Sequence, residues 1–206
     1  MLDTDTKNEK IEYICEKAYE ELLEKGINQF SLNNFIAELQ MSKGQFYYYF
    51  KTKEELICKT IDSKSYEIFN YTYEQTKFKS TFLEKMFVFF SFFLGELDPK
   101  FADWGKLLKS TFHLYLNTDN LEIQQLNRDF DFLILHHIES IFNEMIENGY
   151  LKEEARNFPR SLIATADGMY IHSLMDDNYD MKTYFSEYLI TIDKLLKNDV
   201  KGKGNE

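Results

Sequence analysis

The residues best suited to contacting another molecule lie in Met41–Leu56, a run rich in lysines, tyrosines and small polar residues. Ser42 and Gln45 have the three-residue spacing of a capping box, which predicts that a helix begins here. Gly44 weakens the first turn but lets the backbone come close to another surface. No acidic residue occurs between Met41 and Lys53, so the local charge is +3. Such a helix suits the major groove of DNA, with its first turn at base edges and its hydroxyl and ammonium groups at phosphates.

The alternative interpretation is a solvated helix whose tyrosines belong to the core of the protein. Three consecutive tyrosines, Tyr47–Tyr49, point in directions that span about half a helical turn. They cannot all be buried on one face, which favours a role in contact for at least one of them.

The run Ser42–Leu56 resembles the signature of the tetracycline-repressor (TetR) family of bacterial regulators. In that family the recognition helix of a helix-turn-helix ends in Tyr-x-x-Phe, here Tyr47–Phe50, and Lys-x-x-Leu, here Lys53–Leu56, opens the next helix. The close match covers roughly Ile11–Leu56, about a quarter of the chain. One departure from the family pattern is Gln40, which stands at a turn position that is commonly glycine in the family. The backbone geometry of this turn therefore has to be checked.

The resemblance implies individual roles at the DNA, and the chemistry of the side chains agrees with them. Lys43 and Gln45 are the expected base readers, since lysine donates to guanine acceptors and glutamine pairs bidentately with adenine. Gly44 is expected to pass its backbone close to the groove. Tyr47 is ambiguous between phosphate contact and packing. The expected phosphate contacts are Ser31, Ser42, Tyr48, Tyr49 and Lys53, whereas Phe46 and Phe50 are expected in the core.

These residues require helices to position them, and helical periodicity dominates the sequence. A capping box at Thr6 and Glu9 predicts the first helix, which Gly26 ends. Ser31 is expected to cap a second, short helix, and the helix from Ser42 follows after a tight turn. Three short helices joined in this way predict a helix-turn-helix head.

The rest of the chain is expected to form a larger helical domain. Its expected helices run over about 52–75, 81–97, 104–115, 119–149, 159–175 and 181–196. The helix at 81–97 is apolar on nearly every side, so we expect it to be central and buried. The predicted class is therefore all-α, with about nine helices. The predicted domains are a head at 1–52, a ligand-binding and dimerisation domain at 53–198, and a disordered tail at 199–206.

A small-molecule pocket in the second domain is implied by the family resemblance, which does not specify the ligand. Aromatic and polar residues of the helices expected around its core are the candidates, although each could equally be plain core. The 14 tyrosines and 19 phenylalanines suit an aromatic or lipophilic inducer and suit a packed core as well. The candidate ligand residues are Phe93, Trp104, Phe112, Tyr115, His137 and Tyr170.

The last two helices, at about 159–175 and 181–196, form a plausible homodimer interface. The final helix carries a full apolar stripe, and the preceding one carries small residues that permit close helix approach. Paired across a two-fold axis they would form a four-helix bundle. The alternative is that the stripe faces only its own chain.

Bulk properties limit the remaining classes of function. The net charge is −11, but residues 1–53 carry only −2 and leave −9 for the rest. Because screening confines the electric field of a charge to about 8 Å, local charge decides whether a surface can contact phosphates. Cys15 and Cys58 are not spaced as a metal pair, and no apolar stretch reaches the roughly 20 residues of a membrane span. We expect a cytoplasmic protein without membrane, cofactor or catalytic residues. Histidine spacing offers at most His172 with Asp176, so no metal site is expected.

The sequence therefore predicts a homodimeric DNA-binding transcriptional regulator, a repressor that a small-molecule ligand releases from a palindromic operator. Two alternatives remain open at this point. One is a structural or nucleoid-associated DNA-binding protein that uses the same head without an inducer. The other is a helical binding protein or enzyme with a head-like fold, although no phosphate loop, nucleophile elbow or Glu-x-x-His pair is present.

Overall fold

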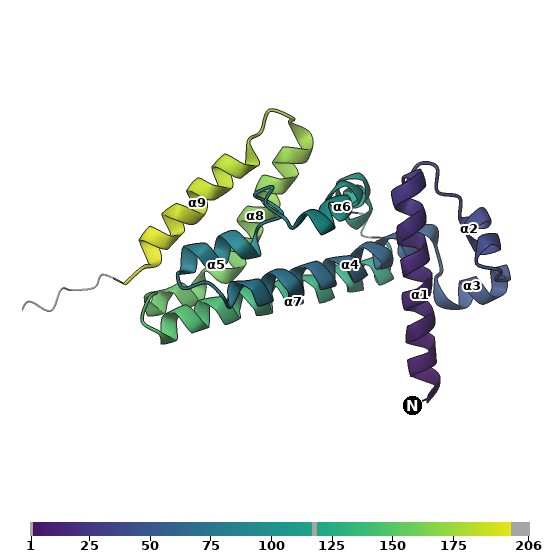
Figure 1. The fold of residues 1–206 in the computed structure, drawn as a ribbon, viewed down its shortest axis with the longest axis horizontal. Coiled ribbons are helices and arrows are strands. Elements are labelled where there is room, and N and C mark those ends of the chain that lie inside the picture. The colour runs from purple at the N-terminus through teal and green to yellow at the C-terminus, as the bar shows by residue number, and fades with distance from the viewer. Residues whose placement is uncertain (1, 117–118, 199–206) are drawn as a thin grey trace, which may run out of the picture. The chain divides into compact units, whose positions relative to one another are not determined.

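The structure is a computed structural model that describes residues 2–116 and 119–198, with side chains from Thr6 onward. In these residues the chain forms nine α-helices and two short 3₁₀ helices (Figure 1), which confirms the predicted all-α class. The predicted disordered tail at 199–206 lies outside the described residues. Within the described part of the chain, no helix is both long and apolar enough to cross a membrane.

Three helices build the N-terminal head: α1 (Leu2–Lys25), α2 (Leu32–Glu38) and α3 (Lys43–Tyr49). Phe46 and Phe50 stack with ring centroids 5.6 Å apart and are both buried, as predicted. Their neighbours in the core come from the apolar faces of all three helices. The buried side chains of the head include Ile14, Ala18, Leu22, Phe35, Ile36, Phe46 and Phe50.

The predicted start of the first helix was wrong. The backbone is helical from Leu2, so Thr6 and Glu9 lie inside α1 and not at its N-terminus. The capping-box spacing is also compatible with the interior of a helix, so this pattern alone did not fix the residue at which the helix begins.

By packing, the chain divides into two compact units, each with its own core. Unit 1 comprises residues 1–68 and 98–131, and unit 2 comprises residues 69–97 and 132–206. Two long helices, α4 (Lys53–Thr76) and α7 (Leu121–Glu147), contribute residues to both units. This division groups residues by packing, and the predicted functional domains at 1–52 and 53–198 remain a prediction.

Unit 1 contains the head together with η1 (Pro99–Phe101) and α6 (Ala102–Tyr115), and α6 packs against α1. The long helix α7 begins behind Asn120, whose Oδ1 accepts hydrogen bonds from the backbone N–H groups of Glu122 at 2.9 Å and Ile123 at 3.2 Å. The cap is therefore Asn120 and not Asp119, the predicted first residue.

Unit 2 contains α5 (Phe82–Phe89), η2 (Glu153–Asn157), α8 (Pro159–Met175) and α9 (Met181–Leu196), and α9 packs against both α5 and α8. Both terminal helices have the predicted bounds. A buried lysine, Lys85 on α5, donates to the carbonyl of Thr76 in the last turn of α4 at 3.0 Å, and its Nζ lies 2.9 Å from the Glu144 carboxylate on α7. This ammonium group satisfies an orphan helix-end carbonyl and ties three helices of the unit together.

The helix predicted over 81–97 is much shorter in the structure. A capping box of Thr81 and Glu84 starts α5 as expected, but the helix ends at Phe89. Beyond it the chain forms turns, in which Gly95 has a positive φ of 69° and the Glu96 N–H donates to the Ser91 carbonyl at 2.8 Å. An apolar run by itself cannot distinguish a helix from buried turns, and here the tertiary packing decided.

The turn between α2 and α3 is a Schellman motif with Gln40 at its left-handed position. Gln40 has a φ of 55°, its N–H donates to the Ala37 carbonyl at 2.9 Å, and the Met41 N–H donates to the Ile36 carbonyl at 3.2 Å. Among the described residues, Gln40 is the only one other than glycine with a positive φ. The tight turn therefore forms, and Gln40 holds it in a conformation that favours glycine.

Gln40→Gly is expected to stabilise the head by about 1 kcal/mol, because it removes the steric cost of a left-handed side chain and keeps both hydrogen bonds. Urea unfolding of the two proteins would measure the difference. The reverse substitution, Gly26→Gln, is the matched control. Gly26 ends α1 at a φ of 71° with open space around its Cα, so this variant should lose a similar amount. Equal stability of the Gln40 variant and wild type would show that the turn carries no strain.

Candidate nucleic-acid interface

The start of α3 is fixed by a complete capping box. The Ser42 Oγ accepts from the Gln45 N–H at 3.2 Å, and the Ser42 N–H donates to Gln45 Oε1 at 2.8 Å. Two orphan donors of the helix end are thereby satisfied within four residues. The first turn of α3, with Lys43 and Gly44, is thus held in shape before any partner arrives.

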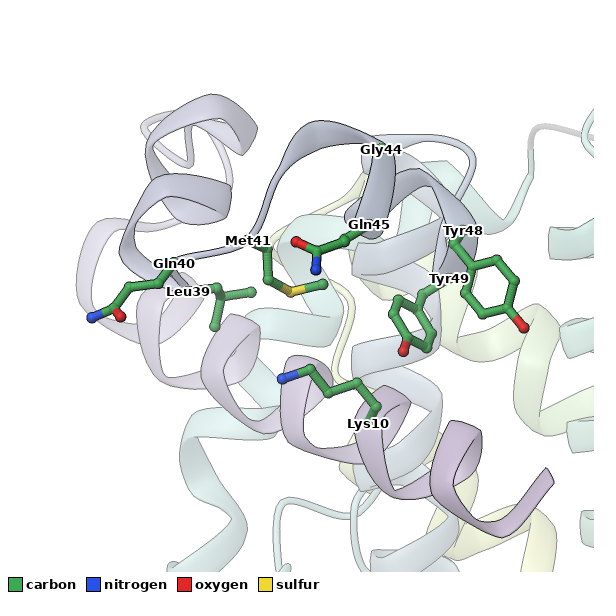
Figure 2. Close-up of a pocket in the computed structure, with 8 residues that line it drawn as sticks. All are labelled: Lys10, Leu39, Gln40, Met41, Gly44, Gln45, Tyr48 and Tyr49. Atoms are coloured by element: carbon green, nitrogen blue, oxygen red, sulfur yellow. The ribbon is translucent and has the colours of Figure 1, made fainter. Parts of the chain in front are cut away.

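The capping box restricts what Gln45 can offer to a partner. Its amide oxygen is already in use, so in this conformation only its NH₂ group is free to donate. Figure 2 shows the amide nitrogen of Gln45 directed away from the helix, toward the space above Lys10. In a bidentate contact with adenine, Gln45 Oε1 would have to accept a second hydrogen bond beside the capping bond, whereas a single bond donated by the NH₂ group would leave the oxygen unchanged.

The three tyrosines of α3 have different surroundings, as their spacing predicts. Tyr47 and Tyr48 are exposed, Tyr48 at 59%, and Tyr49 is half-buried with its ring 5.0 Å from that of Tyr48. Tyr47 also touches the buried Phe46 edge to face, at 5.7 Å. Its position therefore combines packing with exposure, which agrees with the ambiguity in its expected role.

An open groove of about 440 Å³ runs between α1 and α3 (Figure 2). Gly44, Gln45, Tyr48 and Tyr49 of α3 line one side, and Lys10 of α1 lies opposite them. Leu39, Gln40 and Met41, which belong to the α2–α3 turn, complete the lining. Four of the expected DNA contacts thus share one surface with a lysine that the sequence analysis did not select.

Ser31 and Lys53 lie at the ends of neighbouring helices. Ser31 is the N-cap of α2, but its side chain does not make the capping hydrogen bond that was predicted, and its phosphate contact remains a prediction. The ammonium group of Lys53 donates to the carbonyl of Phe30 at 2.6 Å and lies 5.4 Å from the centroid of the Phe30 ring. Lys53 therefore ties the start of α4 to the loop before α2, and its phosphate contact remains a prediction.

The following comparisons relate these features to known proteins. Residues 14–58 match the family model described as bacterial regulatory proteins, tetR family. A fatty acid metabolism regulator protein from Bacillus subtilis (strain 168) is 25% identical over 182 residues, which span 85% of this chain and 89% of the relative.

Two of the similar solved structures cover most of the chain. A TetR-family transcriptional regulator from Cytophaga hutchinsonii has a TM-score of 0.70 at 15% identity, and the match covers 94% of this chain and 98% of that one. The regulator FadR from Bacillus subtilis, in complex with stearoyl-CoA, has a TM-score of 0.61 at 25% identity, with 87% and 95% covered.

The head of this chain, residues 14–58, is similar to the DNA-binding segment of the TetR family of bacterial regulators. The helix-turn-helix is the matched segment, and the similar proteins named above are transcriptional regulators. The roles of single residues at the DNA remain predictions.

In unit 1, two of the candidate ligand residues are engaged in hydrogen bonds. Trp104 is buried and its Nε1 donates to Ser65 Oγ at 3.1 Å, and the Tyr115 hydroxyl lies 3.1 Å from Asp62 Oδ1. Phe112, the third candidate in this unit, is half-buried on the same helix. These contacts are those of a packed core with a polar centre at Asp62.

Asp62 is the least expected group in unit 1, because it is a carboxyl that is only 3% exposed. One oxygen accepts from Tyr115, and the other, Oδ2, has no hydrogen-bond partner among the described residues. Burial raises the pKa of Asp62 from 3.8 to about 6, against the opposing effects of the Tyr115 hydroxyl and Lys59. Burial, followed by the charge of Asp62, also raises the pKa of Tyr115 well above its ordinary value.

In unit 2 the other three candidates lie along one connected series of aromatic contacts. His137 contacts Phe89 with centroids 6.1 Å apart, Phe89 contacts Phe90 at 5.2 Å, Phe90 contacts Phe93 at 5.9 Å, and Phe93 contacts Tyr170 at 5.6 Å. The structure therefore brings Phe93, Tyr170 and His137 into one aromatic network, which extends through residues of α5, α7 and α8.

His137 is held as a neutral ring at one end of this network. Its Nε2 lies 2.8 Å from Asn70 Oδ1, and its ring stacks on Tyr73 with centroids 4.2 Å apart. An amide oxygen only accepts, so Nε2 carries the proton and Nδ1, buried without a partner among the described residues, is an acceptor. Burial lowers the pKa of His137 to about 4.

Lys10, Asp62 and Asn70 are not predicted from the sequence, in which the signal for each is weak. Lys10 lies in a helix dominated by acidic residues, and Asp62 and Asn70 occur as ordinary polar residues on a long amphipathic helix. Their importance comes from partners far away in sequence. Both cysteines are buried, and no group of three or more His, Cys, Asp or Glu that could hold a metal occurs in the described part of the chain.

Gly44→Ala separates a structural from a DNA-contacting role for this glycine. An added Cβ would meet only Ser42 Oγ, at 4.0 Å, and alanine favours the helix, so stability should rise by up to about 1 kcal/mol. If the backbone approaches the groove closely, affinity for the operator should fall by about tenfold or more. Thermal unfolding and fluorescence anisotropy would measure the two effects. Unchanged operator affinity would mean that the backbone of Gly44 does not approach the DNA closely.

Proposed function

We propose that the protein is a homodimeric transcriptional repressor whose two heads read a palindromic operator and which a lipophilic ligand releases. The observation that carries the DNA-binding part is the exposed face of α3. Its pre-formed first turn presents Lys43, Gly44 and the NH₂ group of Gln45, and no acidic residue occurs from Met41 to Lys53. This combination fits base reading from the first turn, with phosphate contacts from Tyr48 and its neighbours.

The proposed dimer interface is formed by α8 and α9, each of which carries an exposed and mainly apolar stripe. On α8, Ala164, Gly168, Ile171 and Met175 recur at intervals of four and three residues, and Met175 is 78% exposed. This spacing places them on one helical face. An added Cβ at Gly168 would meet nothing within 4 Å, so a second helix could approach closely there.

A similar stripe occurs on α9. Tyr184, Tyr188, Thr191 and Leu195 follow the same spacing, and Leu195 is 55% exposed. The opposite side of α9 is buried within unit 2, so the apolar stripe predicted from the sequence is divided between the core and the surface. The Thr165 and Tyr188 hydroxyls lie 3.4 Å apart, which joins the two outer faces. Two such helices pair naturally with two from a second copy as a four-helix bundle.

A dimer also suits the way helix-turn-helix heads read DNA. Two heads read half-sites about one helical turn, or 34 Å, apart. We infer that a ligand favours a conformation in which the separation of the two heads no longer matches the half-sites. The ligand achieves this only through a higher affinity for that conformation than for the DNA-bound one.

For the ligand we propose a long-chain acyl thioester. The aromatic network of unit 2, from His137 through Phe89 and Phe93 to Tyr170, has the apolar chemistry that an acyl chain requires. The acceptor Nδ1 of His137, at the end of this network, would need a donor from the ligand, such as an amide N–H of the coenzyme A arm. The Bacillus subtilis structure with a similar fold holds stearoyl-CoA, which makes this compound the first to test.

The decisive experiment is the selection of bound fragments from the source genome by the purified protein at physiological salt, with and without stearoyl-CoA. Enrichment of one inverted repeat near a promoter, lost when stearoyl-CoA is added, is the expected result. Enrichment that stearoyl-CoA leaves unchanged would contradict the proposed ligand but would still support a sequence-specific regulator. Binding without any enriched sequence would favour the structural, nucleoid-associated alternative, because phosphate attraction alone is independent of sequence.

A further inference from the structure

Two lysines near the N-terminus of α1 lie beside the recognition helix. The Nζ of Lys7 lies 5.0 Å from the ring centroid of Tyr48. Lys10 lines the groove opposite Gln45 and Tyr49, as Figure 2 shows. Residues three apart share one face of a helix, so both lysines belong to the side of α1 that faces α3.

These lysines differ from the others of the same helix in their partners. Lys17 and Lys25 form ion pairs with Glu20 at 2.6 Å and Glu21 at 2.8 Å. Neither Lys7 nor Lys10 forms an ion pair with any side chain that the structure describes, which for this helix means from Thr6 onward. Their contacts are with aromatic faces, since Lys10 also lies 4.7 Å from the Tyr13 ring centroid, and such contacts leave ammonium donors available.

The positive charges of Lys7 and Lys10 add to those of the lysines at and beside α3. Lys43 and Lys51 are exposed on the acid-free run, and Lys7 and Lys10 extend this positive region across the groove to α1. Charges act on phosphates over a screening length of about 8 Å. The Tyr48 ring, under Lys7, carries a hydroxyl that donates to the same type of acceptor.

We propose that Lys7 and Lys10 of α1 form a phosphate-binding edge of the DNA interface, so that a backbone phosphate of the bound duplex lies at the groove between α1 and α3. The inference rests on the proposed DNA-binding function. It assigns to α1 a contact that the helix-turn-helix alone does not supply. Phosphate contacts fix the register of the protein on the duplex and carry no sequence information themselves.

The test measures affinity against salt for the full-length protein, with two probes: the fragment enriched in the genomic selection and mixed-sequence duplex DNA. Each phosphate contact contributes about 0.9 to the slope of log K against log salt concentration. Lys10→Gln is expected to lower this slope by about 0.9 per bound protomer, to weaken both probes by a similar factor, and to leave the far-UV circular dichroism unchanged. Lys7→Gln should behave alike, and Lys10→Arg should retain the wild-type slope.

Lys17→Gln is the matched control, because it removes an equal charge from the same helix at a residue paired with Glu20. It should retain the wild-type slope. Wild-type slopes for Lys7→Gln and Lys10→Gln, with specific binding intact, would overturn the phosphate-binding edge and leave the proposed function standing. A loss confined to the enriched fragment with no change in slope would also overturn it, since that pattern indicates base reading. If wild-type protein binds neither probe, the proposed function itself has failed.

Discussion

Gly168→Glu is expected to convert the proposed dimer into monomers and to abolish tight binding to the proposed operator, while each chain keeps its fold. The side chain would project from the middle of the α8 stripe, where an added Cβ meets open space within the chain. Glutamate is also a better helix former than glycine, so the single chain should not be destabilised. In a dimer, however, two carboxylates would be buried against an apolar surface near the two-fold axis.

An unpaired charge in an apolar interface costs about 3–5 kcal/mol, so dimer dissociation should increase by at least about 100-fold. Operator affinity should fall further, because a monomer loses the gain from binding two half-sites at once. Sedimentation equilibrium and anisotropy on the enriched fragment would measure the two effects. Thr183→Glu is the control, since Thr183 is exposed on α9 outside the stripe. Dimers of unchanged affinity in the Gly168 variant would exclude α8 as the interface.

Asp62→Asn is expected to change the pH dependence of stability more than any other single substitution in unit 1. The pKa of Asp62 is raised from 3.8 to about 6 in the folded protein, so the folded state holds this proton more tightly than the unfolded chain does. The stabilisation that protonated Asp62 gives to the folded state is fully present below pH 3.8 and is lost as the pH rises through 6. Above pH 6 the loss amounts to about 3 kcal/mol.

Asparagine does not titrate, so the free energy of unfolding of Asp62→Asn minus that of wild type should rise by about 2.5 kcal/mol between pH 4 and 8. A cost of the new amide in unfolding free energy that is the same at every pH does not affect this rise. The difference between the two proteins also cancels the contribution of His137, whose lowered pKa acts with the opposite sign, with stability lost as the pH falls from 6.5 through 4. Urea unfolding at several pH values would provide the data.

Tyr115→Phe removes a hydroxyl whose hydrogen bond lowers the pKa of Asp62, so in that variant the loss should move to higher pH. If the difference in unfolding free energy between Asp62→Asn and wild type does not change with pH, the pKa of Asp62 is the same in the folded and the unfolded chain, and burial does not raise it.

Local sequence chemistry determined the parts of this protein that depend on neighbours within a few residues. The capping boxes of Ser42 with Gln45 and of Thr81 with Glu84 form as predicted. The bounds of α8 and α9 also agree, because Pro159 and the turn before Met181 punctuate the chain. The head was recognisable from one run of residues for the same reason, since hydrogen bonds between residues three apart are encoded in the spacing itself.

Contacts between distant residues were decided by the tertiary structure alone. Tyr115 reaches Asp62 across 53 residues, and His137 reaches Asn70 across 67. Nothing in the sequence near Asp62 distinguishes a buried carboxyl from a solvated one, because the difference lies in which helix covers it. The same applies to Lys10, whose place beside α3 follows from how α1 packs in the head. Periodicity specifies which face of a helix is apolar, and only packing specifies what that face and its polar neighbours meet.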